Sequence, residues 1–349
     1  MRILIANDGP YAHKYIRLGL ARAFSACGHE TVIWELGQKS AFDMFDEFQP
    51  EIFYCPTYHF NEDIVKCLLE RPYIRVAGKA GDWGIAQKDM DLKEYPILVA
   101  TQKEIDTVLK LKEETGKPDF VDIHYHQTSV NLTHSYWIDN GIKAVGLLSA
   151  ADISDYINGQ KRPELECDIA FVGGYWPYKS KTLNKWLIPL CHPKENYNIK
   201  IFGNQPWGVP QYCGFINTPD MRDLFVSAKI CPTISEPHSQ VYGHDIIERP
   251  FKLLSCKAFA ISDYVKSMEE HVFKDNLIYA KTPEEFREKI DYFLKNPDER
   301  DDYINRGYNH VINNHTYFHR VAQFFTELGL PYEAINCLKT YERIKEQIS

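Results

Sequence analysis

The chain has 349 residues, of which 44% are hydrophobic and 25% are charged. This composition is typical of a globular protein, and the length suits two domains better than one. The formal net charge of -8 argues against a general nucleic-acid-binding protein, since such proteins are usually basic. A local basic groove stays compatible with this value, because net charge does not describe where the charges lie.

Nine cysteines are present, and no two of them have the Cys-x-x-Cys spacing. Most lie inside apolar runs such as Ile230-Cys231-Pro232, which favours reduced core residues over a disulfide framework or a zinc site. The first six residues enter a strand pattern without the apolar stretch of a signal peptide. No run reaches the length of a membrane span. We therefore expect a cytoplasmic protein with no membrane span.

Strand-like apolar runs alternate with helical patterns along the chain, which predicts parallel α/β units. The first strand is predicted at 2–7, and the helix after it ends at Gly28. A later helix carries Ile105 and Val108 and ends at Gly116. Further strands are predicted at 31–34, 51–55, 74–77, 97–100, 120–124 and 144–148.

A polar stretch at 158–164 has the composition of a linker, and the α/β pattern restarts after it. The second half is predicted to hold strands at 168–172, 199–202, 230–234, 258–262 and 277–280, with a helix at 179–190. We predict two Rossmann-like domains, at 1–158 and 166–325. A helical tail at 326–349 is expected to cross back to the first domain. Such a pair places a ligand cleft outside the carboxyl ends of its strands.

Gly173 and Gly174 follow the first strand of the second half and precede a helix. Glycines at such a turn let the backbone approach a phosphate, and the helix start offers free N–H groups. Lys179 and Lys181 would add charge-assisted contacts. The alternative is an ordinary strand-to-helix turn with two solvated lysines.

A second group is the run from His244 to Arg249, which precedes a predicted strand. Asp245 and Glu248 have capping-box spacing, which predicts a helix start. Arg249 in a first helical turn opposes the helix dipole, and a bound pyrophosphate would resolve this conflict. The alternative is that the two acids cap the helix and Arg249 pairs with one of them.

Asn204 ends the predicted strand at 199–202 with a Gly-Asn turn, and Phe215 follows a second turn. An amide group and an aromatic ring at a strand end suit a nucleotide base, although a plain strand end is the simpler interpretation. In the first half, Asp82 lies in a Gly-rich loop after a strand, where it could deprotonate an acceptor hydroxyl. His13, in the loop after the first strand, is the next candidate base. Aspartate in a turn is also ordinary.

Two patterns resemble metal sites but are not expected to bind metal. Asp89-Met90-Asp91 has the Asp-x-Asp spacing of metal-dependent transferases, but it lies in a charged stretch and not after a strand. His124 and His126 share one face of a strand end without a third ligand nearby. We therefore expect no metal site.

The segment from Glu248 to Ala258 resembles the Glu-Arg-x-Phe-Glu-x-x-Ala-Cys-Gly stretch of CgeB-like spore-maturation glycosyltransferases. The run 229–232 and the tail pattern from Phe286 to Arg320 are similar to the same group. The resemblance covers about 168–325. Two positions depart from it, because Lys252 replaces a glutamate and Lys257 replaces a glycine.

This resemblance implies a GT-B fold and a nucleotide-sugar donor held by the second domain. It places Gly173, Gly174, Lys181 and Arg249 at the phosphates, Asn204 and Phe215 near the base, and Glu248 near the ribose or sugar. The chain is also similar to phage DNA β-glucosyltransferases, in which a first-domain aspartate is the base. Asp82 is the counterpart of that aspartate here.

These observations lead us to expect a metal-independent hexosyl- or pentosyltransferase without a cofactor. It would move a sugar from a nucleotide diphosphate donor, preferably a UDP-sugar, to a hydroxyl of a glycan, a protein or a modified DNA base. One alternative is a phage-type DNA glycosyltransferase that acts on hydroxymethylated bases. Another is a catalytically silent nucleotide-binding protein of the same fold.

Overall fold

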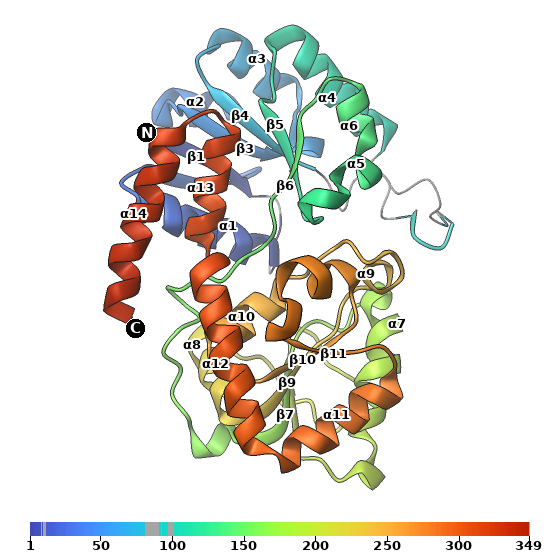
Figure 1. Cartoon of the computed structure of the whole chain (residues 1–349). Helices are drawn as coiled ribbons and strands as arrows, with labels where there is room; N and C mark the ends of the chain where they lie inside the picture. Colours follow the sequence, from blue (N-terminus) through green and yellow to red (C-terminus); the bar gives the residue numbers. More distant parts are fainter. Residues whose placement is uncertain (8, 10–11, 81–90, 92, 97–100, 349) are drawn as a thin grey trace. The chain divides into compact units, whose positions relative to one another are not determined.

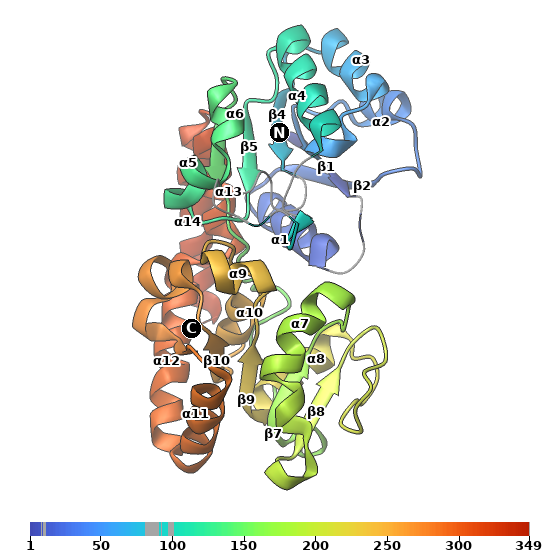
Figure 2. The same cartoon turned by 90° about the vertical axis from the view of Figure 1, so that its right-hand side faces the viewer.

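The computed structural model describes residues 1–7, 9, 12–80, 91, 93–96 and 101–348. The chain divides into two compact units, which Figures 1 and 2 show from two directions. Unit 1 comprises Met1–Ser149 and Tyr317–Ser349, and unit 2 comprises Ala150–Thr316. Compared with the boundaries expected from the sequence, residues 150–158 thus move to unit 2 and residues 317–325 move to unit 1.

Among the described residues, unit 1 holds a six-stranded parallel sheet in the order β2-β1-β3-β4-β5-β6. Its strands are β1 (Arg2–Asn7), β2 (Glu30–Glu35), β3 (Ile52–Pro56), β4 (Arg75–Lys79), β5 (Phe120–Ile123) and β6 (Ala144–Gly146). Each of these was predicted to within about two residues. The strand predicted at 97–100 lies outside the described residues.

Helices cover both faces of this sheet, as expected for a buried parallel sheet. The helices are α1 (Ala12–Ala26), α2 (Ala41–Phe48), α3 (Glu62–Glu70), α4 (Gln102–Thr115), α5 (Val130–Thr133), α6 (Ser135–Asp139), α13 (Tyr317–Glu327) and α14 (Pro331–Ile348). On one face, Phe53 packs in a core with Ile64 of α3 and Val108 of α4. The next residue of β3, Tyr54, points the other way and contacts Phe324 of α13. This alternation follows from the two-residue period of a strand.

The C-terminal helices α13 and α14 belong to unit 1, and Asn336 of α14 donates a hydrogen bond to the backbone oxygen of Cys27, which confirms the predicted crossing. Phe324 of α13 makes edge-to-face contacts with Phe24 of α1 and with Phe120 of β5. Arg320 is buried, and its Nε donates a hydrogen bond of 2.9 Å to the backbone oxygen of Leu148. The aromatic core of unit 1 therefore needs residues from both ends of the chain.

Unit 2, which is described throughout, holds a five-stranded parallel sheet in the order β11-β10-β9-β7-β8. Its strands are β7 (Cys167–Val172), β8 (Ile199–Phe202), β9 (Ala228–Thr233), β10 (Ala260–Asp263) and β11 (Ile278–Ala280). The chain passes from β7 to its neighbour β8 and then returns to the other side of β7 to form β9. The carboxyl ends of β7 and β9 thus flank a reversal of strand order, which is where open α/β sheets bind ligands.

The helices of unit 2 again cover both faces of the sheet. They are α7 (Pro177–Trp186), α8 (Thr218–Ser227), α9 (Pro237–Tyr242), α10 (Arg249–Ser255), α11 (Pro283–Lys295) and α12 (Pro297–Asn314). Leu183 and Trp186 of α7 pack with Phe286 and Ile290 of α11 over one face. In the described part of the chain, no helix combines the length and apolar character that crossing a membrane requires.

The return of α13 over α1 gives a first prediction. A Cβ atom at Gly19 would overlap the ring of Tyr317. We expect Gly19→Ala to lower the free energy of unfolding by about 1–3 kcal/mol, the usual cost of overpacking, although the better helix propensity of alanine offsets about 1 kcal/mol. Urea unfolding followed by circular dichroism measures the change.

The control is the same substitution in a Tyr317→Ala background, where the ring is absent. There, Gly19→Ala should be neutral or stabilising, because only the propensity gain remains. An equal loss of stability in both backgrounds would contradict this packing account.

Candidate functional site

The candidate site lies at the carboxyl edge of the sheet in unit 2, where the turns after β7 and β8 meet. The Nε1 atom of Trp207 donates a hydrogen bond of 3.1 Å to the backbone oxygen of Gly173. Gly203, just after β8, comes so close to the same oxygen that a Cβ atom at position 203 would overlap it. The two turns therefore pack backbone against backbone, which explains why glycine occupies position 203.

The structure brings several predicted donor-site residues together here. The Oδ1 atom of Asn204 lies 3.2 Å from where a Cβ atom on Gly174 would be. The backbone nitrogen of Gly203 donates to the oxygen of Gly214, which precedes Phe215. The ring of Phe215 is 71% exposed, so it is available to a ligand.

Arg249 is the first residue of α10, and its side chain reaches the end of β7. Its Nη2 atom donates a hydrogen bond of 2.9 Å to the backbone oxygen of Val172. The guanidinium group lies over the ring of Phe171, 4.2 Å from the ring centre. Burial lowers the pKa of Arg249 to about 10, so the group stays charged at neutral pH.

The second terminal nitrogen of the Arg249 guanidinium, Nη1, has a different environment from Nη2. Its Nη1 atom is shielded from solvent and has no hydrogen-bond partner among the described residues. A buried donor without a partner costs about 1–3 kcal/mol, and more when it is charged. Buried polar groups in native proteins nearly always have a partner, so the lack of one at this atom calls for an explanation.

The two lysines predicted at the phosphates have different environments. Lys179 is buried on α7, and its Nζ atom lies 2.9 Å from Oε1 of Glu236. Burial of its ammonium group lowers the pKa of Lys179, and the negative charge of Glu236 opposes that shift. Lys181 is exposed and lies over the ring of Tyr178 at 5.6 Å. The interpretation of both lysines as simply solvated is therefore wrong for Lys179.

The predicted capping box of Asp245 and Glu248 is wrong. Helix α10 begins only at Arg249, and Glu248 at its N-cap makes no capping hydrogen bond. Both acids are held elsewhere. Asp245 accepts a 3.0 Å hydrogen bond from the hydroxyl of Ser239, and a carboxylate oxygen of Glu248 lies 2.7 Å from Nζ of Lys252.

This second pair bears on the departure noted in the sequence. Lys252 stands where the CgeB-like pattern has a glutamate, and here it neutralises Glu248 one turn earlier on the helix. His244, predicted in the same group, lies near Ser267, with 3.5 Å between Nδ1 and the serine Oγ. Burial lowers the pKa of His244, which favours a neutral ring at pH 7.

Sequence reasoning missed two buried acids at the same sheet edge. Asp263 ends β10, and its carboxylate accepts hydrogen bonds from the backbone and hydroxyl of Ser235 and from Gln240. Glu236 follows β9 and is 7% exposed. Both come at or just after the carboxyl end of a parallel strand, and that position was the signal that could have found them.

The catalytic candidates belong to unit 1. Asp82 lies outside the described residues, as does Asp89 of the Asp-x-Asp pattern. His13 lies in the first turn of α1 and is half-buried. Within the described ranges, no three His, Cys, Asp or Glu side chains are grouped so that they could hold a metal ion.

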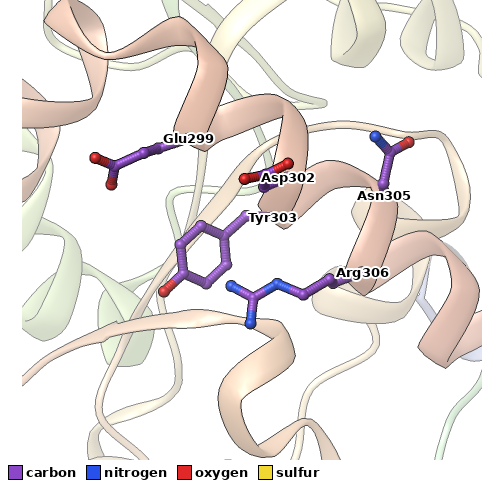
Figure 3. Close-up of a pocket in the computed structure, with 5 residues that line it drawn as sticks. All are labelled: Glu299, Asp302, Tyr303, Asn305 and Arg306. Carbon is purple, nitrogen blue, oxygen red and sulfur yellow. The ribbon is translucent and has the colours of Figure 1, made fainter.

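A hollow on unit 2 lies outside this site. Figure 3 shows that it is lined by residues of one helix, α12, namely Glu299, Asp302, Tyr303, Asn305 and Arg306. Glu299 accepts a hydrogen bond of 2.6 Å from the hydroxyl of Tyr292, and the Arg306 guanidinium lies 4.1 Å from the centre of the Tyr303 ring. We assign no ligand to this hollow, because two of its charged groups are already engaged.

Residues 179–326 match the model of a family described as glycosyl transferase-like. A comparison with curated proteins gives no sequence match. The family match thus lies on the part of the chain that carries Arg249, Glu236 and most other donor-site candidates.

Solved structures match over nearly the whole chain. A T4 phage protein, BGT, in complex with UDP and Mn²⁺ has a TM-score of 0.60 at 13% identity, covering 94% of this chain and 99% of that one. An α-glucosyltransferase in complex with UDP and a 13-mer DNA has a TM-score of 0.64 at 12% identity, covering 94% and 99%. Sucrose-phosphate synthase from Thermosynechococcus elongatus has a TM-score of 0.63 at 8% identity, covering 93% and 98%. The chain therefore has the two Rossmann-like units of GT-B glycosyltransferase structures, as the sequence predicted.

The position of Arg249 gives a second prediction. A Cβ atom at Gly173 would lie 2.7 Å from Nη2 of Arg249, whereas one at Gly174 would come no closer than 3.2 Å to any neighbour, the exposed Asn204 side chain. We expect Gly173→Ala to displace the guanidinium from the Val172 oxygen and lower the free energy of unfolding by about 1–3 kcal/mol. Gly174→Ala, the matched control, should change it by less than about 0.5 kcal/mol. Equal losses in urea unfolding of the two variants would show that the guanidinium is not held in this way.

Proposed function

We propose that the protein is a glycosyltransferase that binds a UDP-sugar at the carboxyl edge of the unit 2 sheet and transfers the sugar to an acceptor hydroxyl. The observation that carries this proposal is the enclosed, unpartnered Nη1 atom of Arg249 beside the Gly173 turn. A fixed cation next to backbone groups that a ligand can approach suits a diphosphate. The match to a glycosyl transferase-like family model and the shared fold support the same assignment.

In this mechanism the acceptor oxygen attacks the anomeric carbon of the donor sugar. The bond from that carbon to the diphosphate oxygen breaks, and its electron pair leaves with the nucleotide diphosphate. Asp82 takes the acceptor proton, with His13 as the second candidate. A retaining reaction at the same carbon would use the same leaving group, and it need not use a base at this position.

The main task of unit 2 is then to stabilise the charge that develops on the leaving diphosphate. Arg249 has a charge that the described residues leave partly unsatisfied, whereas Lys179 is already paired with Glu236. Lys181, which is exposed, is the second cation available to the phosphates. Preorganised donors of this kind account for a large part of enzymic rate enhancement. We propose that these groups make a metal ion unnecessary.

A second candidate concerns the acceptor. The likeness to an α-glucosyltransferase solved with DNA favours a hydroxymethylated DNA base, while the net charge of -8 opposes binding to a polyanion. At 12% identity the likeness concerns the fold alone, so glycan and protein acceptors stay in the proposal. A catalytically silent nucleotide-binding protein would bind UDP but neither hydrolyse nor transfer the donor.

The third prediction tests the donor site. Arg249→Ala should weaken UDP binding by about 1.5–3 kcal/mol in isothermal titration calorimetry, the value of a hydrogen bond to a charged group. Arg306→Ala is the matched control, because Arg306 also lies over an aromatic ring, at 4.1 Å from Tyr303, but on α12. It should leave UDP affinity unchanged. Equal affinity of wild type and Arg249→Ala for UDP would remove Arg249 from the site.

The same titration in EDTA tests the proposed metal independence. UDP affinity and transfer activity should persist when the chelator is present. Loss of both in EDTA, restored by Mn²⁺ or Mg²⁺, would show that a metal ion carries the charge instead. The test discriminates between the two possibilities, because the T4 phage BGT structure contains Mn²⁺ together with UDP.

The fourth prediction concerns the base. Asp82→Asn should preserve the melting temperature and UDP affinity, and it should lower turnover by roughly 10²–10⁴-fold, the usual contribution of a general base. Turnover per folded molecule at saturating UDP-sugar is the measurement, with hydroxymethylated DNA among the acceptors. Near-wild-type turnover in Asp82→Asn, with a large loss in His13→Gln, would transfer the role to His13.

A further inference from the structure

Glu236 is a buried acid that the mechanism above uses only as the partner of Lys179. Its side chain follows β9, the neighbour of β7, and is 7% exposed. One carboxylate oxygen, Oε1, lies 2.9 Å from the ammonium of Lys179. The other, Oε2, is shielded from solvent and has no hydrogen-bond partner among the described residues. Half of this carboxylate is therefore unsatisfied.

Arg249 has a hydrogen-bond donor, Nη1, that is unsatisfied in the same way as Oε2 of Glu236, and the charges of the two side chains interact. Glu236 is the acid whose charge acts most strongly on Arg249, and Nη1 of Arg249 also lacks a partner in the described part of the chain. The two side chains come from the carboxyl edges of adjacent strands, since Arg249 is tied to the end of β7 and Glu236 follows β9. One bound group can satisfy both atoms if it donates to one and accepts from the other.

Few chemical groups meet that requirement. A phosphate oxygen accepts but does not donate, so the Glu236 carboxylate would repel it. An ammonium donates but does not accept, so Arg249 would repel it. A hydroxyl does both, because its O–H can donate to Oε2 while its lone pairs accept from Nη1. The Nη1 atom carries two N–H groups, so it can serve a hydroxyl and a phosphate oxygen at once.

We propose that Glu236 is a specificity-determining residue of the donor site, and that with Arg249 it holds one hydroxyl of the nucleotide-sugar donor. The inference rests on the proposed function, because it requires that the donor binds at this sheet edge. The hydroxyl can belong to the transferred sugar or to the ribose of the nucleotide. In either case Glu236 recognises the donor and does not only neutralise Lys179.

The test compares affinities for UDP-glucose, UDP and 2′-deoxy-UDP by isothermal titration calorimetry of the full chain. Glu236→Gln keeps the shape of the side chain and a carbonyl oxygen for Lys179, but it removes the carboxylate. The readout is the ratio of affinities and not any single affinity, because the lost charge affects every diphosphate ligand. UDP carries about one more negative charge than UDP-glucose and gains more from the loss of a carboxylate, so a fall in the UDP-glucose to UDP ratio counts only if the charge-retaining variant Glu236→Asp shows it too.

If the hydroxyl is on the sugar, the preference for UDP-glucose over UDP should fall by about 10- to 100-fold, as expected for a hydrogen bond to a charged group. If it is on the ribose, the preference for UDP over 2′-deoxy-UDP should fall by that factor instead. Unchanged ratios of both kinds would overturn the proposal and leave Glu236 bonded to water or to Lys179 alone.

Two further variants keep the result interpretable. Glu236→Asp retains the charge but withdraws the carboxylate by one methylene, so it should lower the same ratio even if Glu236→Gln folds poorly. Asp122→Asn is the matched control, because Asp122 is a buried acid paired with Lys79 at 3.7 Å in unit 1. It should leave both ratios unchanged, and an equal effect from it would also overturn the proposal. Wild-type protein that binds neither UDP nor UDP-glucose would instead refute the proposed function itself.

Discussion

The enclosed positive charge of Arg249 is the constraint on which the rest of the site depends. A guanidinium group loses much of its hydration on burial, and the protein repays this loss with one backbone oxygen and one aromatic face. These contacts orient the group but leave Nη1 without a partner in the described chain. The absence of a side chain at Gly173 is a condition for this placement, since a Cβ atom there would lie 2.7 Å from the guanidinium. A ligand oxygen at this place would restore what burial removes.

The same edge of the sheet contains a buried ion pair, Lys179 and Glu236, whose main effect is to position charges and not to stabilise the fold. A buried lysine–carboxylate pair often contributes little net free energy, because desolvation offsets much of the attraction. The pair of Lys179 and Glu236 does place two opposite charges at fixed positions beside Arg249. The charges of Lys179, Glu236 and Arg249 influence one another, and together they have one positive charge in excess until Asp263 is counted. Burial raises the pKa of Asp263, which reduces the weight of that last negative charge.

Much of the fold could be predicted from the sequence because its strands are short, apolar and separated by punctuating residues. Gly28 ends α1 with a positive φ of 90°, and the end of α4 at Gly116 has a φ of 72°. Both were visible as glycines after amphipathic runs. The site was less predictable. The spacing of Asp245 and Glu248 matched a capping box, but a local pattern cannot reveal that Ser239 and Lys252 compete for the same carboxylates. Glu236 was missed because its partner Lys179 lies 57 residues away.

Each unit has a buried lysine–carboxylate pair at the carboxyl edge of its sheet. In unit 1, Lys79 ends β4 and lies 3.7 Å from Asp122 of the adjacent strand β5, whose carboxylate also accepts from the hydroxyl of Tyr54. In unit 2, the lysine and the acid follow the adjacent strands β7 and β9. The two pairs differ in whether both oxygens of the carboxylate have partners among the described residues. Asp122 has partners from two other strands, Lys79 of β4 and Tyr54 of β3, so its carboxylate belongs to a satisfied structural network. Glu236 has a partner among the described residues on one carboxylate oxygen only. Its other oxygen could therefore accept a hydrogen bond from a ligand, whereas the carboxylate of Asp122 already has protein partners.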